Sequence, residues 1–186
     1  MAGPFRILSI SGSLRKASFN RGLIRAAQEV ASEGVVVDPV EIDALPHYDA
    51  DVDAAGDPPA VTEFKELIAA ADALLIATPE YNHSISAVLK NAIDWASRPY
   101  GAAVISGKPA AVMGAAGGSG ATKRAQSTLR NVLAATRVRV LAEPELLVGG
   151  AYERFDVEGN LTDDTIRDEL RALLDALVDF ARQPAR

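Results

Sequence analysis

The sequence predicts an α/β fold in which helices cover both faces of a five-stranded parallel sheet, forming a three-layer sandwich. Two observations predict it. Short apolar segments alternate along the chain with longer segments that carry apolar residues at helical spacing. The second apolar segment also contains a proline, which favours a place for that strand at an edge of the sheet and so selects one strand order.

The first half of the chain contains three predicted strands and two predicted helices. Residues 6–10 are typical of a buried strand, and residues 35–42, rich in β-branched side chains, form the second strand. Between them, residues 20–33 carry apolar side chains every three or four positions, and Gly34 marks the end of this helix. After a polar stretch, residues 73–78 form a third strand, preceded by a helix whose apolar positions are Val61, Phe64, Leu67 and Ile68.

The second half continues the alternation. Residues 109–114 and 137–141 are the fourth and fifth strands, and the last helix opens at Thr162-Asp-Asp, where acidic residues suit the positive end of the helix dipole. The apolar positions that predict the three helices of this half are Val88, Leu89, Ala92, Ile93 and Ala96, then Leu129, Val132 and Leu133, then Ile166, Leu170, Leu173, Leu174, Leu177 and Val178. No internal repeat or linker divides the chain, so we expect residues 1–186 to form a single domain.

Pro39 decides between the common strand orders. Proline cannot donate a hydrogen bond to a neighbouring strand, so the second strand is expected at an edge. That position fits the flavodoxin-like order 2-1-3-4-5, in which ligands bind beyond the carboxyl ends of the strands at the switch between strands 1 and 3. The loops after strands 1, 3 and 4 are therefore expected to carry the chemistry.

The loop after the first strand, Ser11-Gly-Ser-Leu-Arg-Lys-Ala-Ser-Phe-Asn20, favours a bound phosphate. It runs into a helix N-terminus, whose free N–H groups attract an anion, and Ser13, Arg15, Ser18 and Asn20 offer further donors. It lacks both the P-loop ending and the G-x-G-x-x-G turn, which argues against a kinase, an ATPase or a resident NAD. The alternative is an ordinary polar turn in which Ser18 or Asn20 caps the helix.

Two further loops suit a planar ligand. Thr78-Pro-Glu-Tyr-Asn82-His-Ser84 is a turn stiffened by proline, which can present backbone groups to a flat heterocycle. Gly114-Ala-Ala-Gly-Gly-Ser-Gly120 is rich in glycine, as expected where backbone approaches a ligand closely. Either segment alone is also consistent with a plain turn or a mobile loop. Together the three loops describe a site with a phosphate at one end and a planar group at the other, the shape of flavin mononucleotide (FMN).

Composition excludes several classes of function. The formal net charge of -6 argues against nucleic acid as a partner, and no apolar run is long enough to span a membrane. With no room for a signal peptide before the first strand, we expect a cytoplasmic protein. The chain has no cysteine, which excludes disulfides and thiolate chemistry, and the two histidines, His47 and His83, lack metal-ligand spacing. We therefore expect no metal, and any redox chemistry requires an organic cofactor.

The sequence resembles the NAD(P)H-dependent FMN reductases, a family with a flavodoxin-like fold that includes quinone and chromate reductases. Three segments carry the resemblance, which runs from residue 5 to about residue 180: Gly12-Ser-Leu-Arg-Lys-Ala-Ser-Phe-Asn20, Pro79-Glu-Tyr-Asn82 and Leu89-Lys-Asn-Ala-Ile-Asp-Trp95. The resemblance implies that Ser13, Arg15, Ser18 and Asn20 hold the FMN phosphate and that Phe19, in the same loop, also contacts the cofactor. It implies that Pro79, Glu80, Tyr81, Asn82, Gly117, Gly118 and Ser119 line the isoalloxazine ring.

The resemblance also implies the reaction. NADPH or NADH would pass a hydride to the flavin, and a quinone-like acceptor would then take two electrons in a ping-pong cycle that needs no catalytic side chain. Two other interpretations stay open: a flavodoxin-type electron carrier, which Arg15 disfavours, and a phosphate-sensing module without redox chemistry. Relatives are typically homodimers or homotetramers, so Trp95 is either part of a dimer contact, with Asp94, or a core residue.

Two further segments near the site are singled out by the sequence. Many members of the family carry Pro-Gly where this chain has Ser86-Ala87. The following helix is therefore expected to start differently, which leaves the shape of the mouth of the site open. The segment from His47 to Asp53, with Tyr48, is expected to overhang a pocket.

Overall fold

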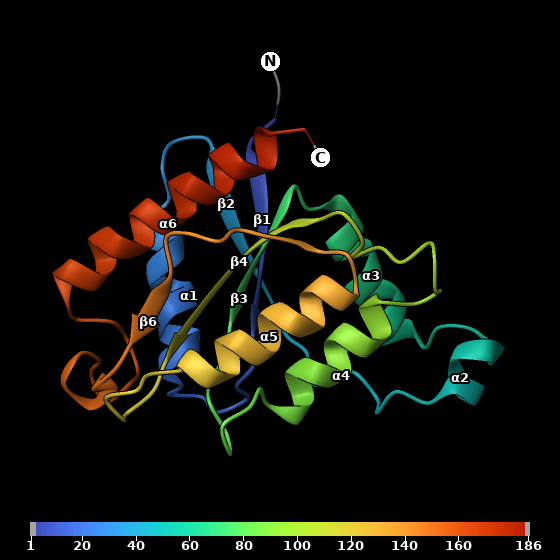
Figure 1. The fold of residues 1–186 in the computed structure, drawn as a ribbon, viewed down its shortest axis with the longest axis horizontal. Helices are drawn as coiled ribbons and strands as arrows, with labels where there is room; N and C mark the ends of the chain where they lie inside the picture. Colours follow the sequence, from blue (N-terminus) through green and yellow to red (C-terminus); the bar gives the residue numbers. More distant parts are fainter. Residues whose placement is uncertain (1–2, 185–186) are drawn as a thin grey trace.

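The computed structural model describes residues 3–184 and contains a parallel sheet with the strand order β2-β1-β3-β4-β5 (Figure 1). The strands are β1 (Phe5–Ser11), β2 (Val35–Val40), β3 (Ala73–Ala77), β4 (Pro109–Ala115), β5 (Arg139–Val140) and β6 (Leu146–Val148). All of the strand pairs are parallel, and β6 pairs with the last three residues of β4. The predicted strand order is confirmed, and Pro39 lies in the edge strand as expected.

Helices cover both faces of the sheet, as the sequence predicts. In Figure 1, α1 (Phe19–Val30) and α6 (Asp164–Arg182) lie on one side of the strands. The other side carries α3 (Pro59–Ala70), α4 (Ala87–Ala96) and α5 (Lys123–Ala135). Each face has its own apolar core: Leu23 and Leu174 pack with Leu75 on the first face, and Phe64 and Leu129 pack with Leu74 on the second. The alternation of Leu74 and Leu75 follows from the two-residue period of a strand.

The fifth strand differs from expectation. The sequence predicts one strand over residues 137–141, but the structure has two short strands, β5 and β6, separated by a segment that contains Pro144. Proline offers no N–H for a ladder, so pairing with β4 stops at Leu141 and resumes at Leu146. As a result β6 runs beside the carboxyl end of β4, and the residues after β6 lie near the carboxyl ends of the strands.

The segment from His47 to Asp53 does not overhang the crevice that the three loops form. It leads into a short helix, α2 (Ala50–Ala55), and its Tyr48 ring packs edge-on against Trp95, with ring centroids 5.0 Å apart. Trp95 is fully buried and its Nε1 donates to the Pro46 carbonyl at 2.8 Å. Trp95 is therefore a core residue, which excludes its indole from a contact between copies of the chain.

Between residues 3 and 184, no helix combines the length and apolar character that crossing a membrane requires.

Candidate functional site

The three loops predicted to carry the chemistry meet in one crevice beyond the carboxyl ends of β1, β3 and β4. The crevice encloses about 400 Å³, within the range of small-molecule sites. Nine of its twelve lining residues are predicted site residues: Ser13, Arg15, Ser18, Phe19, Asn20, Pro79, Glu80, Tyr81 and Gly117. The other three lining residues, Ala115, Ala116 and Tyr152, were not predicted. Asn82, Gly118 and Ser119 belong to the same loops but do not line the crevice.

The first loop ends in a helix cap and leaves a cation free. Ser18 is the N-cap of α1, and its Oγ accepts from the backbone N–H groups of Asn20 and Arg21. Arg15 is exposed, and among residues 3–184 its guanidinium has no hydrogen-bond or ion-pair partner; the guanidinium carbon lies 5.2 Å from the centroid of the Phe19 ring. The first turn of α1 contains no acidic residue. The helix dipole and Arg15 therefore give this end of the crevice a positive potential suited to an anion.

Asn20 connects the first loop to β4. Its Nδ2 donates to the Ala115 carbonyl and its Oδ1 accepts from the Ala115 N–H, both at 3.0 Å. The pairing imitates the exchange of two backbone hydrogen bonds between strands, and both residues are buried. The amide is thus engaged at both ends, which leaves one N–H for a ligand and gives Asn20 a structural role that the sequence does not reveal.

The second loop is tied to the first through Ser86. The hydroxyl of Ser86 donates to the Gly12 carbonyl at 2.6 Å and also accepts from the Leu89 N–H, so that Ser86 is the N-cap of α4. Gly12 has no room for a side chain, because a Cβ there would lie 2.9 Å from Pro79 Cδ. The helix therefore starts at Ala87, with Ser86 as its cap.

The third loop packs against an aromatic side chain from much later in the chain. A Cβ on Gly117 would lie 2.2 Å from Cε2 of Tyr152, so the glycine allows the ring to lie directly on the loop. Tyr152 comes from a short 3₁₀ helix, Ala151–Glu153, just after β6, and meets Phe19 edge-on with centroids 5.4 Å apart. Tyr152 thus closes one side of the crevice. Nothing in the local sequence marks it, because its position depends on β6.

Glu80 lies in the second loop with its side chain only 14% exposed. Burial favours the neutral acid, but hydrogen bonds from Ala125, His83 and Arg124, together with the charge of Arg124, outweigh it and hold the pKa of Glu80 below its ordinary value. The carboxylate is therefore ionised at neutral pH. The crevice lining thus contains a negative charge at Glu80 as well as the positive charge of Arg15 in the first loop.

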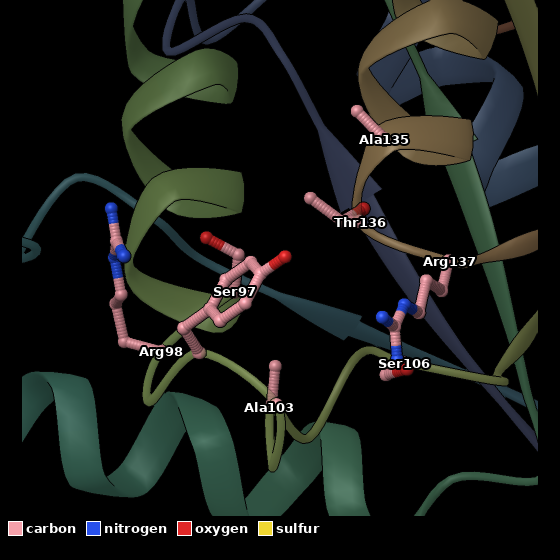
Figure 2. A pocket seen from close by; sticks show the side chains of 9 residues that line it. Ser97, Arg98, Ala103, Ser106, Ala135, Thr136 and Arg137 are labelled. Atoms are coloured by element: carbon pink, nitrogen blue, oxygen red, sulfur yellow. The ribbon is translucent and has the colours of Figure 1, made fainter.

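A second hollow lies at the other end of the strands, near the start of β4 (Figure 2). Its lining comes from the segment that leads into β4, including Ser97 and Ser106, and from the end of α5 at Thr136 and Arg137. It encloses about 180 Å³, less than small-molecule sites usually do. In Figure 2 the side chain of Arg98 turns away from Arg137. The Arg98 guanidinium carbon lies 5.2 Å from the centroid of the Tyr48 ring, which the figure does not draw. The crevice, with its larger volume and its free cation, is the better candidate site.

Comparison with known proteins agrees with this geometry. The family model described as NADPH-dependent FMN reductase matches residues 5–153. An NAD(P)H-dependent FMN reductase of Pseudomonas aeruginosa is 45% identical over 183 residues, covering 98% of each chain. A 2-hydroxy-1,4-benzoquinone reductase of a Burkholderia species is 41% identical over 177 residues, covering 95% of this chain and 96% of the relative.

A solved structure shows the same likeness in three dimensions. The flavoenzyme NAD(P)H:(acceptor) oxidoreductase of Paracoccus denitrificans superposes with a TM-score of 0.86 at 37% identity, covering 95% of this chain and 97% of the other. The likeness extends over nearly the whole length of both chains. The chain belongs to the NADPH-dependent FMN reductase family.

Proposed function

We propose that the protein is an FMN-dependent oxidoreductase that takes electrons from NADPH or NADH and passes them to a quinone-like acceptor. The observation that carries the proposal is the crevice itself: a free arginine and a helix N-terminus lie at one end, and the loops after β3 and β4 form the other. Family membership supports the same cofactor, and relatives named as quinone reductases support the class of acceptor.

The residues fit FMN in charge and in shape. The guanidinium of Arg15 has no protein partner among the described residues, and the Ser13 hydroxyl lies nearby on the same loop, so both suit the phosphate. Pro79, Tyr81 and Gly117 line the part of the crevice nearest β3 and β4, where the flat ring would lie. Asn82, Gly118 and Ser119 belong to the same two loops but lie outside this lining, and their contact with the ring stays a prediction.

FMN, when bound, supplies the chemistry by accepting a hydride from the nicotinamide and giving two electrons to the acceptor. The protein's part is to bind the phosphate, orient the ring and leave one face of it open to both substrates in turn. Tyr81 is 53% exposed at the rim of the crevice, where a second planar molecule would arrive. No side chain is required as a proton donor or nucleophile, so we assign no catalytic residue.

The first experiment is an absorbance spectrum of the protein mixed with FMN, followed by anaerobic addition of NADPH. We expect a bound-flavin band that bleaches when NADPH is added. A band that persists would instead indicate an electron carrier of the flavodoxin type. Failure to bind FMN at all would overturn the phosphate assignment.

Arg15→Ala tests the phosphate end directly. We expect it to raise the Kd for FMN about 10-fold to 100-fold, because a charge-assisted hydrogen bond contributes about 1.5–3 kcal/mol. Lys16→Ala is the matched control. This substitution removes one positive charge from the same loop, but Lys16 does not line the crevice. Equal weakening by both variants would show that only the general charge of the loop matters.

The family's usual assembly, a homodimer or homotetramer, and the cytoplasmic location stay predictions. The choice between NADH and NADPH is likewise open, and we propose to compare kcat/KM for the two with one acceptor. Sedimentation equilibrium of the FMN-loaded protein measures the assembly.

A further inference from the structure

Glu80 joins the second loop, on one wall of the crevice, to α5, the helix that follows the glycine-rich loop of the other wall. Its Oε2 accepts from the backbone N–H groups of Arg124 and Ala125, at 3.0 Å and 3.2 Å. These groups belong to the first turn of α5, whose own N-cap, Thr122, makes no capping hydrogen bond with its side chain. The carboxylate therefore replaces the missing cap, but it comes from a different loop, 44 residues earlier in the chain.

Side chains hold the same carboxylate from its other oxygen. Nη1 of Arg124 and Nδ1 of His83 lie 3.5 Å and 3.4 Å from Oε1 of Glu80. Both partners are mostly exposed, whereas the carboxylate is largely buried. The negative charge also lies at the positive end of the α5 dipole, which strengthens the contact. Two backbone N–H groups of α5 and the side chains of Arg124 and His83 thus surround one carboxylate.

The contact links the two walls of the crevice. Glu80 immediately follows Pro79, which lines one wall, and α5 immediately follows the glycine-rich loop, which forms the other. On one side the glycine-rich loop is held by Tyr152, which packs on Gly117, and by backbone hydrogen bonds to Val148, Gly150 and Ala151. On the side of α5, where a Cβ on Gly118 or Gly120 would meet no atom within 4 Å, Glu80 links the helix that follows the loop to the second loop.

We propose that Glu80 is a positioning residue: by capping α5 from the opposite wall, it fixes the width of the slot that receives the cofactor's ring. The inference rests on the proposed function, because it concerns how tightly FMN is held. The length of the side chain is the decisive property. A side chain long enough to accept hydrogen bonds from the Arg124 and Ala125 N–H groups preserves the width of the slot, whatever its charge.

Three variants separate reach from charge. Glu80→Gln keeps the length of the side chain and an acceptor oxygen but removes the charge. Glu80→Asp keeps the charge but is one methylene shorter, and Glu80→Ala removes both. We expect the Kd for FMN, measured by quenching of flavin fluorescence, to stay within about threefold of wild type for the glutamine variant. We expect it to rise about tenfold or more for the other two, since two charge-assisted hydrogen bonds are lost.

Asp163→Ala is the matched control for general loss of stability. Asp163 caps α6 in the same manner, accepting from the Thr165 and Ile166 N–H groups and pairing with Arg154, but it does not line the crevice. We expect this variant to lower the melting temperature, as removal of a helix cap does, and to bind FMN like wild type. Weakened binding in the control as large as in Glu80→Ala would overturn the inference.

The outcomes are distinct from a failure of the proposed function. If wild-type protein binds no FMN, the proposed function fails and the inference falls with it. If wild type binds FMN and Glu80→Ala binds it equally well, only the inference fails. If the glutamine variant binds as poorly as the alanine variant, the charge rather than the reach is responsible and the inference is again wrong. Should Glu80→Ala fail to fold, the aspartate and glutamine variants decide the question between them.

Discussion

Replacing Asn20 with alanine should destabilise the fold itself, independently of any cofactor. The variant removes both hydrogen bonds to Ala115 and leaves a buried N–H and a buried carbonyl without partners. A buried polar group left unsatisfied costs about 1–3 kcal/mol, so two of them, partly relieved by water entering from the crevice, should cost about 2–4 kcal/mol. This is a large share of the 5–15 kcal/mol by which a typical protein of this kind is stable.

The assay is urea unfolding of protein freed of FMN, followed by circular dichroism, so that the result reports the fold alone. Asn131→Ala is the control, because Asn131 is exposed on α5 and the same substitution there should change the free energy of unfolding by less than about 0.5 kcal/mol. Asn20→Asp is a second probe: it still accepts from the Ala115 N–H but sets a carboxylate against the Ala115 carbonyl, so it should be destabilised at least as much as Asn20→Ala. A loss of less than about 1 kcal/mol in Asn20→Ala would refute the reasoning.

Three further outcomes follow from the same structure. Gly22→Ala in α1 should destabilise the protein by about 1–3 kcal/mol in chemical denaturation, because the new Cβ would lie 2.0 Å from the Gly159 carbonyl oxygen; a gain, which alanine usually gives within a helix, would contradict it. Gly117→Ala should displace the Tyr152 ring and weaken FMN binding with little change in melting temperature, and adding Tyr152→Ala should weaken binding no further than Tyr152→Ala alone. Asp163→Asn should make the free energy of unfolding depend less on pH at acid pH. The hydrogen bond from the Ile166 N–H and then the contact with Arg154 lower the pKa of Asp163 from its ordinary 3.8, so the carboxylate stabilises the fold above pH 3.8 and loses this effect as the pH falls through its folded-state pKa. Parallel curves of stability against pH for the two proteins would refute this expectation.

The sequence predicts most of the fold because the signals are local. Pro39 selects the strand order, because a residue without an N–H would leave a hydrogen bond unmade in an interior strand but is tolerated in an edge strand. The apolar stripe of α6 and its acidic cap can be seen directly in the sequence. The break between β5 and β6 was missed because β6 has only three residues, too few for a periodic pattern.

The candidate site was predictable at the level of loops rather than contacts. Nine residues of the crevice lining follow from the loops' place at the strand ends, but their partners do not. Asn20 pairs with Ala115, 95 residues away, and Glu80 caps a helix 44 residues away. Tyr152 reaches the crevice only because β6 returns the chain to it. Each of these contacts depends on how distant segments pack together, which no local pattern contains.

The two borders of the sheet have a consequence for how copies of the chain can meet. An open strand edge is a template on which another strand can add, and proteins usually need to block it. Here one border carries Pro39 and Asp38, and the other consists of two fragments, β5 and β6, of two and three residues. Neither border offers an unbroken row of donors and acceptors. Growth into fibres by strand addition is therefore disfavoured, and self-association is left to the helical faces and the loops.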